Sequence, residues 1–372
     1  MSHLTSRRRV VQAGSAMAAV MTVPFVGRAF AQESTPSASP AAATPAASSV
    51  IDFTPGVIDT LLGEVTLPEN PQRVLCINDG PVDTMLNLGL VPLIVGGSYG
   101  AGEAGILDYL VPYAPEGTIE NVGDDADYDL ERIIELKPDL IIAEGRQRFI
   151  DATTREEAEA NELVQSLQRI APLVIPKDID TSDPLGLQYF EYSHLVWSHA
   201  LGKLEEGQAL LDAQHAKTEQ LHTDLAAHTG ETTIVFRPTD EFPLVMAQTW
   251  FTGVLLRRVG LVGNAYAESV EYPHSGSSLS MEQINELDAD WIFVAPRFAA
   301  EQSADQIAVL DAYFGNPLFT SLPAIAAGHY GVVSGQLWSG ANGVIAADII
   351  LDNIRSVILD GVQDQVAAAA SS

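Results

Sequence analysis

The stretch that decides the fold reads Tyr128-Asp129-Leu130-Glu131-Arg132-Ile133-Ile134-Glu135-Leu136-Lys137-Pro138-Asp139-Leu140-Ile141-Ile142-Ala143. Its first ten residues place apolar side chains at helical spacing, and Pro138 ends the helix because proline lacks a backbone hydrogen-bond donor. The residues that follow, 139–143, are apolar after Asp139 and predict a short buried strand. A helix that passes directly into a buried strand is typical of α/β proteins with parallel sheets.

The same helix–strand unit recurs in the second half of the chain. There, Leu279–Leu287 predicts the helix and Trp291–Ala295 the strand. When Glu131 is aligned with Glu282, the isoleucine two positions on, the acid four on, the leucine five on and the aspartate eight on all match. The match spans both elements, which indicates two related halves.

A second pair of elements supports two related halves. Each half also has an apolar strand followed by a helix that ends at a glycine: Arg73–Ile77, Pro81–Leu88 and Gly89 in the first, and Thr233–Phe236, Thr252–Val259 and Gly260 in the second. Val91–Val95 predicts one more strand of the first half. Because strands alternate with helices, the expected fold class is α/β, with two lobes built on mainly parallel sheets.

The N-terminal segment predicts an exported protein. Arg7-Arg8-Arg9 precedes an apolar run over 13–27, and Ala29-Phe30-Ala31 forms a small-residue cleavage site. The adjacent arginines resemble a twin-arginine signal, so the expected location is the periplasm or the cell surface. An uncleaved segment would act as a membrane anchor, and this alternative stays open. A lipid anchor is not expected because no cysteine directly follows the apolar run.

Composition and periodicity divide the chain into segments. These are a signal peptide (1–31), a disordered linker rich in serine, proline and alanine (32–49), an N-terminal lobe (50–200), a connecting helix (201–229), a C-terminal lobe (230–362) and a flexible tail (363–372). Gly202 is expected to divide the apolar periodicity of 185–228 into two helices. A helix over 203–228 would be about 39 Å long, and one stiff crossing of this kind permits twisting but little hinge closure.

The charge balance disfavours a role in nucleic-acid binding. Four of the 19 basic residues lie in 1–31, which leaves 15 against 49 acidic residues. Binding to phosphates needs clustered lysine and arginine, which such an acidic surface lacks. The single cysteine, Cys76, lies in an apolar run and is expected to be a small buried side chain.

Several separated motifs carry a family resemblance. They are Pro71-Gln72-Arg73-Val74-Leu75, Leu88-Gly89, Asp129-Leu130-Glu131-Arg132-Ile133, Leu136-Lys137-Pro138-Asp139-Leu140-Ile141-Ile142, Asn316-Pro317-Leu318-Phe319 and Leu322-Pro323-Ala324. In this order they resemble the siderophore, haem and cobalamin binding proteins of iron-uptake ABC importers. The resemblance covers most of residues 60–360 and implies two Rossmann-like lobes, a rigid connecting helix and a shallow ligand cleft between the lobes. It also implies a non-catalytic monomer, peripheral to the membrane, whose partners are the importer's transmembrane subunits.

Basic side chains gather where the predicted strands end. In open α/β sheets the ligand site lies beyond the carboxyl ends of the strands. Four of the 15 remaining basic residues, namely Arg146, Arg148, Arg237 and Arg297, fall in these loops. Arginine presents a planar fork of donors that suits carboxylate and catecholate oxygens, so we expect an anionic ferric siderophore as the ligand and no resident cofactor. Pairing of each arginine with a local acid is the alternative.

Aromatic residues near the same loops could form flat walls for a ligand. They are Tyr99, Trp250, Tyr272, Phe298 and Trp338, and core or lip packing is the alternative for each. Trp338 is the strongest candidate because it follows a strand and precedes Ser339-Gly340. Tyr272 and His274 could coordinate haem iron, which leaves haem or cobalamin open as the ligand.

Two matched acids are candidates for contact with the importer. By the resemblance, Glu131 and Glu282, each at the head of a helix, would dock with arginines of the transmembrane subunits. Paired acids on two related lobes suit a two-fold symmetric partner. A stabilising interaction of each acid with its own helix dipole is the alternative.

The sequence offers little support for catalysis or for a dedicated metal site. The common hydrolase and nucleotidase motifs do not occur, and the glycine-rich run 100–105 continues into prolines rather than a helix. An exported α/β enzyme with an unrecognised site remains the alternative of another class. His194 and His199 lack partners for a closed metal site, so no metal ligands are assigned.

Overall fold

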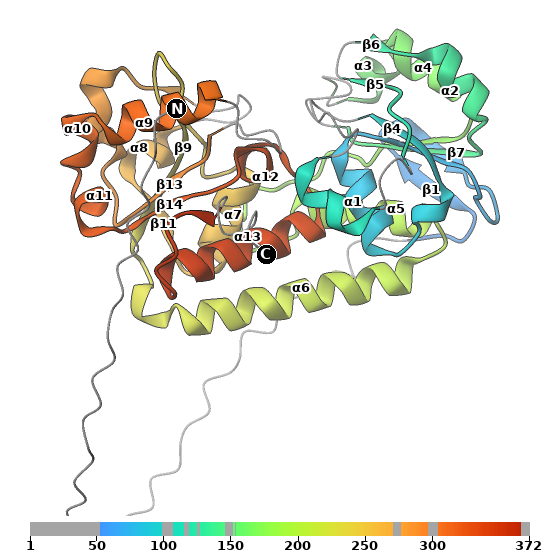
Figure 1. Ribbon diagram of the computed structural model, residues 1–372. Helices are drawn as coiled ribbons and strands as arrows, with labels where there is room; N and C mark the ends of the chain where they lie inside the picture. The colour runs from blue at the N-terminus through green and yellow to red at the C-terminus, as the bar shows by residue number, and fades with distance from the viewer. Residues whose placement is uncertain are drawn as a thin grey trace, which may run out of the picture. The chain divides into compact units, whose positions relative to one another are not determined.

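The computed structural model describes residues 53–98, 107–114, 119–124, 127–145, 152, 154–270, 277–296 and 304–365. These residues form two α/β lobes, as the ribbon in Figure 1 shows. The sequence-based fold class is confirmed.

The N-terminal lobe is built on a parallel sheet with the strand order β4-β3-β7-β8. Its strands are β3 (Val74–Ile77), β4 (Ile94–Ser98), β7 (Leu140–Ala143) and β8 (Leu173–Val174). Its helices and 3-10 turns are α1 (Asp79–Asn87), η2 (Val91–Leu93), η3 (Asp108–Tyr113), α2 (Leu130–Leu136), α3 (Arg155–Ala160), α4 (Glu162–Gln168) and α5 (Tyr189–Ala200). Two antiparallel hairpins accompany the sheet, β1 (Val57–Thr60) with β2 (Gly63–Thr66), and β5 (Gly123–Asp124) with β6 (Asp127–Tyr128). The strand expected at Val91–Val95 begins later, after the turn η2.

Both faces of the N-terminal sheet are covered by helices. Val74 and Cys76 of β3 point into a core with α1 and α5, whereas Leu75 and Ile77 point into a core with α2 and α4. This alternation follows from the two-residue period of a strand. Cys76 is fully buried, as expected, and burial raises the pKa of its thiol.

The C-terminal lobe repeats this arrangement and adds an antiparallel edge. Strands β11, β9, β13 and β14 are parallel, and β10 and β12 extend the sheet beyond β9. The strands are β9 (Thr232–Arg237), β10 (Leu244–Val245), β11 (Val262–Gly263), β12 (Ser277–Ser278), β13 (Trp291–Val294) and β14 (Tyr330–Val332). The helices and 3-10 turns are α7 (Phe251–Arg258), α8 (Ala265–Ser269), η5 (Met281–Leu287), α9 (Ala304–Phe314), α10 (Pro317–Thr320), α11 (Pro323–Ala327), α12 (Gly335–Gly340) and α13 (Val344–Ile358).

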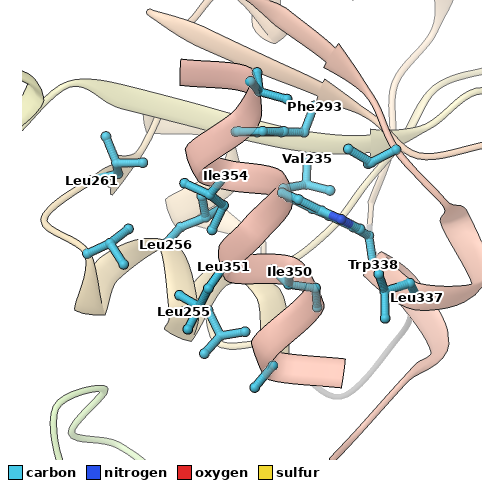
Figure 2. Packing of buried hydrophobic residues seen from close by; sticks show 14 of the residues in the cluster. Val235, Leu255, Leu256, Leu261, Phe293, Leu337, Trp338, Ile350, Leu351 and Ile354 are labelled. Carbon is cyan, nitrogen blue, oxygen red and sulfur yellow. The ribbon is translucent and has the colours of Figure 1, made fainter. Parts of the chain in front are cut away.

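Helix α13 lies in the core on one face of the C-terminal sheet. Figure 2 shows its apolar side packed against α7, the strands and the indole of Trp338. Ile350 and Ile354 are fully buried there. The opposite face packs against η5, α9, α10 and α11.

The matched residues of the two halves have matching structural roles. The aspartate eight positions after the aligned acid binds the start of the lobe's first strand in both cases. Asp139 accepts hydrogen bonds from the backbone amides of Gln72 and Arg73, at 2.8 and 2.9 Å, just before β3. Asp290 accepts one from the amide of Thr232, at 2.7 Å, where β9 begins. The two lobes are therefore related in their contacts as well as in their sequence pattern.

The connecting segment is shorter than the sequence suggested. Gly202, with φ of 68°, separates α5 from α6 as expected. Helix α6 spans Leu204–Asp224, about 32 Å at 1.5 Å per residue, and a 3-10 turn, η4 (Ala226–His228), replaces its expected last turn. In Figure 1 α6 runs alongside α13, and it also contacts α5 and α7.

Helices from each half enter the core of the other. Ile345, in the first turn of α13, belongs to the core of the N-terminal lobe, and Phe190 of α5 belongs to the core of the C-terminal lobe. The connection between the lobes therefore rests on three helices, α5, α6 and α13. Among the described residues, no helix combines the length and the hydrophobicity needed to cross a membrane.

Candidate ligand-binding site

The ends of the N-terminal strands meet at one edge of the sheet. Asn78 follows β3, and its amide donates to the backbone oxygen and to Oγ of Ser98, the last residue of β4, at 3.1 and 3.2 Å. Glu144 follows β7, and its amide donates to the backbone oxygen of Ile77 at 3.3 Å. These residues occupy the edge at which doubly wound sheets bind ligands.

The corresponding edge of the C-terminal sheet carries a fixed arginine. Arg237 ends β9, and its Nη2 donates to Oγ of Ser339 on α12 at 2.6 Å. Ser339 Oγ in turn donates to the backbone oxygen of Gly335 at 2.6 Å. This chain of bonds holds a guanidinium, a group suited to carboxylate oxygens, at the edge where the sequence predicted it.

Helix α12 packs closely against the end of β13. A Cβ atom at Gly335 would overlap the backbone oxygen of Pro296, so only glycine allows this approach. Beyond α12, Nδ2 of Asn342 donates to Oε1 of Glu144. The segment from Gly335 to Asn342 therefore links the edge that carries Arg237 to the edge of the N-terminal sheet.

Most of the other predicted ligand residues lie outside the described residues. These are Arg146, Arg148, Arg297, Tyr99, Tyr272, His274 and Phe298. Their assignment stays a prediction. The described residues that precede two of these loops, Gly145 and Pro296, directly follow the strand ends named above.

Trp338 is not part of a ligand wall, which corrects the strongest aromatic candidate. Its side chain is 0% exposed and stacks on Phe293, with ring centroids 4.6 Å apart (Figure 2). Its Nε1 donates to Oδ1 of Asn353 on α13 at 3.0 Å. The sequence suggested a loop after β14, but Ser334 caps α12 there by accepting from the amide of Leu337, and the helix turns Trp338 into the core.

Trp250 is half-buried and immediately precedes α7. It packs against the same core cluster of the C-terminal lobe. A role in ligand contact stays a prediction.

A buried carboxylate of the N-terminal lobe caps a helix that ends in the C-terminal lobe. Asp83 of α1 is 0% exposed and accepts hydrogen bonds from the amides of Ile345 and Ala346, the first turn of α13, at 3.0 and 3.1 Å. A Cβ at Gly343 would overlap this carboxylate. Burial raises the pKa of Asp83 to about 7, although the amide donors act in the opposite direction.

A second buried carboxylate forms a charged contact between the lobes. Glu191 of α5 binds Arg258 of α7 through two hydrogen bonds of 2.5 and 2.9 Å, and His215 of α6 lies 2.5 Å from its Oε1. Burial alone would raise the pKa of Glu191, but the bonds from His215 and Arg258 outweigh it and lower the pKa to about 2. No sequence pattern indicated this contact or the Asp83 contact.

The two predicted docking acids occupy equivalent and exposed positions. Glu131 is the second residue of α2 and Glu282 the second residue of η5, and both helices begin at a capping residue, Asp129 or Ser280. Both acids are exposed. In the described part of the chain neither forms an ion pair. Docking stays a prediction.

The two histidines that the sequence analysis did not assign as metal ligands have structural partners. His194 is buried, its Nε2 donates to the backbone oxygen of Gly207, and its Nδ1 accepts from Thr84 Oγ1, both at 3.1 Å. His199 Nε2 donates to the backbone oxygen of Thr54 at 3.1 Å. Within the described ranges, no group of three or more His, Cys, Asp or Glu side chains could hold a metal ion.

A pocket of about 340 Å³ lies at the other end of the C-terminal sheet. It is lined by Thr232, Asp288, Ala289, Asp290, Pro323, Ala324, Ala327 and His329. Thr232 begins β9 and His329 precedes β14, so this pocket is at the amino ends of the strands. It is distinct from the edge at which such sheets bind ligands.

Two related α/β lobes joined through long helices are the architecture of a solute-binding protein. The chain belongs to the periplasmic binding protein family, whose model matches residues 74–333.

Named relatives agree with this assignment. The chain is 26% identical to the Fe(3+) dicitrate-binding periplasmic protein FecB of Escherichia coli (strain K12), over 79% of this chain and 87% of FecB. It is also 26% identical to the achromobactin-binding periplasmic protein of Dickeya dadantii (strain 3937), over 77% of this chain and 86% of that protein. The structure of Staphylococcus aureus SirA complexed with staphyloferrin B shares the fold, with a TM-score of 0.63 at 20% identity, over 81% of this chain and 97% of SirA.

Proposed function

We propose that this chain is an exported solute-binding protein that captures an anionic ferric siderophore and delivers it to an ABC importer. The observation that carries the proposal is Arg237, a guanidinium held at the strand-end edge of a chain whose net charge is −30. A positive group kept at this edge, in so acidic a molecule, favours a ligand with excess negative charge.

The relatives support the same ligand class. FecB is a ferric dicitrate-binding protein by its name, and SirA is described in complex with staphyloferrin B. A fold alone does not define a ligand, so these names support the proposal only together with the arginine. Arg146, Arg148 and Arg297 are proposed to complete the positive edge.

Delivery is proposed to use Glu131 and Glu282. Their equivalent, exposed positions on the two lobes fit a partner with two-fold symmetry and basic side chains, namely the transmembrane subunits of the importer. The protein is proposed to act as a monomer at the outer surface of the membrane, after export through a twin-arginine signal.

A native-mass titration tests the ligand class. The purified protein is mixed in turn with ferric dicitrate, ferric staphyloferrin B, haemin and cobalamin. We expect a complex with one anionic ferric chelate per chain and an unaltered ligand mass. Tightest binding of haemin or cobalamin would establish the alternative ligand within the family, and a ligand that returns chemically changed would establish an exported enzyme instead.

A further inference from the structure

One strand-to-helix turn at the ligand edge has an unfavourable backbone. Asn78 lies between β3 and α1 with φ of 74° and ψ of 173°. This region is essentially restricted to glycine, so a side chain there strains the backbone. Lys137 is the other described non-glycine residue with positive φ, but its values of 48° and 57° are those of an ordinary left-handed helix end.

The Asn78 side chain does not stabilise the fold in return. Asparagine at a helix N-cap usually accepts a hydrogen bond from the first turn, yet the Asn78 side chain makes no such bond. The residue is 3% exposed, and within the described part of the chain its Oδ1 is buried without a hydrogen-bond partner. A buried carbonyl oxygen without a donor is a further cost to stability. For stability alone, glycine would be the better residue.

The position of Asn78 is the one where a cargo would lie. Strand β3 is inside the sheet, between β4 and β7, and Asn78 is at its carboxyl end. The adjacent Ser98 is 2% exposed and donates through Oγ to the hydroxyl of Tyr128 at 3.4 Å. In the other lobe the corresponding strand, β9, ends at Arg237. The strands β3 and β9 are thus each followed or ended by a polar side chain at the ligand edge.

We propose that Asn78 is a specificity-determining ligand contact of the N-terminal lobe. Its unpaired Oδ1 accepts a hydrogen bond from a hydroxyl or amide N–H of the chelate, while Arg237 binds the anionic oxygens. The inference rests on the proposed function and narrows the ligand class to ferric chelates that combine anionic oxygens with a neutral hydrogen-bond donor. A donor lacking from the ligand leaves the site's buried acceptor unpaired, which is a strong means of discrimination.

Replacement of Asn78 by glycine separates its effect on stability from its effect on ligand affinity. Asn78→Gly removes the contact and relieves the backbone, and Lys137→Gly is the matched control, because it also places glycine at a positive φ but at the exposed end of α2. Melting temperature and affinity are measured for both variants and the wild type, with ferric dicitrate and ferric staphyloferrin B as probes.

We expect Asn78→Gly to melt at or above the wild-type temperature and to bind the preferred probe at least tenfold more weakly. Lys137→Gly should retain wild-type affinity. Unchanged affinity in Asn78→Gly would overturn the inference, and so would a lower melting temperature, which would assign the side chain a structural role. If the wild type binds neither probe nor any other ferric chelate, the proposed function itself fails.

Discussion

The two lobes are alike at the surface predicted to meet the importer and different at the edge predicted to meet the ligand. Glu131 and Glu282 occupy the same position in matched helices, and both are exposed. At the strand ends, by contrast, the N-terminal lobe presents the neutral Asn78 and the C-terminal lobe the cationic Arg237. This difference is what we expect if the docking partner is two-fold symmetric and the cargo is not.

The contacts that join the lobes are also unequal. Asp83 and Glu191 of the N-terminal lobe both accept hydrogen bonds from later parts of the chain. Asp83 accepts from backbone amides of α13 and from the hydroxyl of Tyr109 in its own lobe, whereas Glu191 binds the guanidinium of Arg258 and the imidazole of His215. The pKa values of the two groups consequently shift in opposite directions.

Charge reversal at Glu131 and Glu282 should have the largest effect, on uptake through the importer. We expect the double variant Glu131→Lys, Glu282→Lys to abolish importer-stimulated uptake, because both charges would repel basic groups of the partner. Each single variant should lose part of the activity. Uptake into proteoliposomes measures this effect, and the affinity of the double variant for its ligand should be unchanged. A double variant that transports normally would refute the docking hypothesis.

Loss of the charged contact between the lobes should reduce stability strongly. Arg258→Ala leaves Glu191 buried beside the His215 imidazole but without its guanidinium partner, and isolation of a buried charge in this way typically costs about 3–5 kcal/mol. Denaturant unfolding measures the loss. Arg355→Ala is the control, because Arg355 pairs with Asp224 at the surface between the same halves and should matter little. Equal effects of the two substitutions would contradict a special role for the buried pair.

Loss of the Arg237 guanidinium should weaken ligand binding, and this effect should be smaller than the two above. Arg237→Ala is expected to reduce affinity for the preferred ferric chelate about tenfold, the effect of one charge-assisted contact. Isothermal titration measures the change. The control is Arg257→Ala, since Arg257 pairs with Glu268 on α7 and α8, and its affinity should match that of the wild type. Equal affinity of Arg237→Ala and wild type would remove the arginine from the site.

The contact between Asp83 and the first turn of α13 should show the smallest effect. We expect it to change how the stability depends on pH. The pKa of Asp83 is about 7 in the fold against an ordinary value of 3.8, so the folded state holds its proton more tightly than the unfolded state does. The contribution of this residue is therefore most favourable at low pH and is lost as the pH rises from about 4 through 7.

Asp83→Asn should remove that dependence. Its melting temperature relative to the wild type should increase between pH 5 and pH 8. Glu191 does not interfere in this window, because its lowered pKa matters only below about 4.5. Melting curves of variant and wild type that stay parallel from pH 5 to pH 8 would show that Asp83 does not titrate there.

The fold was largely accessible from sequence because its signals are local. The helix–strand repeat, the buried Cys76 and the break at Gly202 all follow from periodicity and residue type within short windows. Boundaries shifted where a 3-10 turn replaced an expected element, as in η2 before β4 and η4 after α6. The sequence repeat also aligned Asp139 with Asp290, and both accept a hydrogen bond from a backbone amide at the start of a strand.

The site was accessible only in part, because its decisive contacts are not local. Asp83 meets Ile345 across 262 residues of sequence, and Glu191 meets Arg258 across 67, separations at which no pattern identifies the partner. Trp338 was misplaced for a local reason: the cap at Ser334 starts a helix where a loop was expected. The residue type of Asn78 does not predict its backbone angles, so the strain at this position can be recognised only in the structure.

The charge preference for the ligand is the sharpest test of an anionic ferric chelate as the cargo. The protein is titrated with two ferric chelates of opposite net charge, anionic ferric dicitrate and cationic ferrioxamine B, at low and at raised salt. We expect tighter binding of the anionic chelate, with an advantage that decreases as salt is added. Tighter binding of the cationic chelate, or no binding of either, would contradict an anionic cargo.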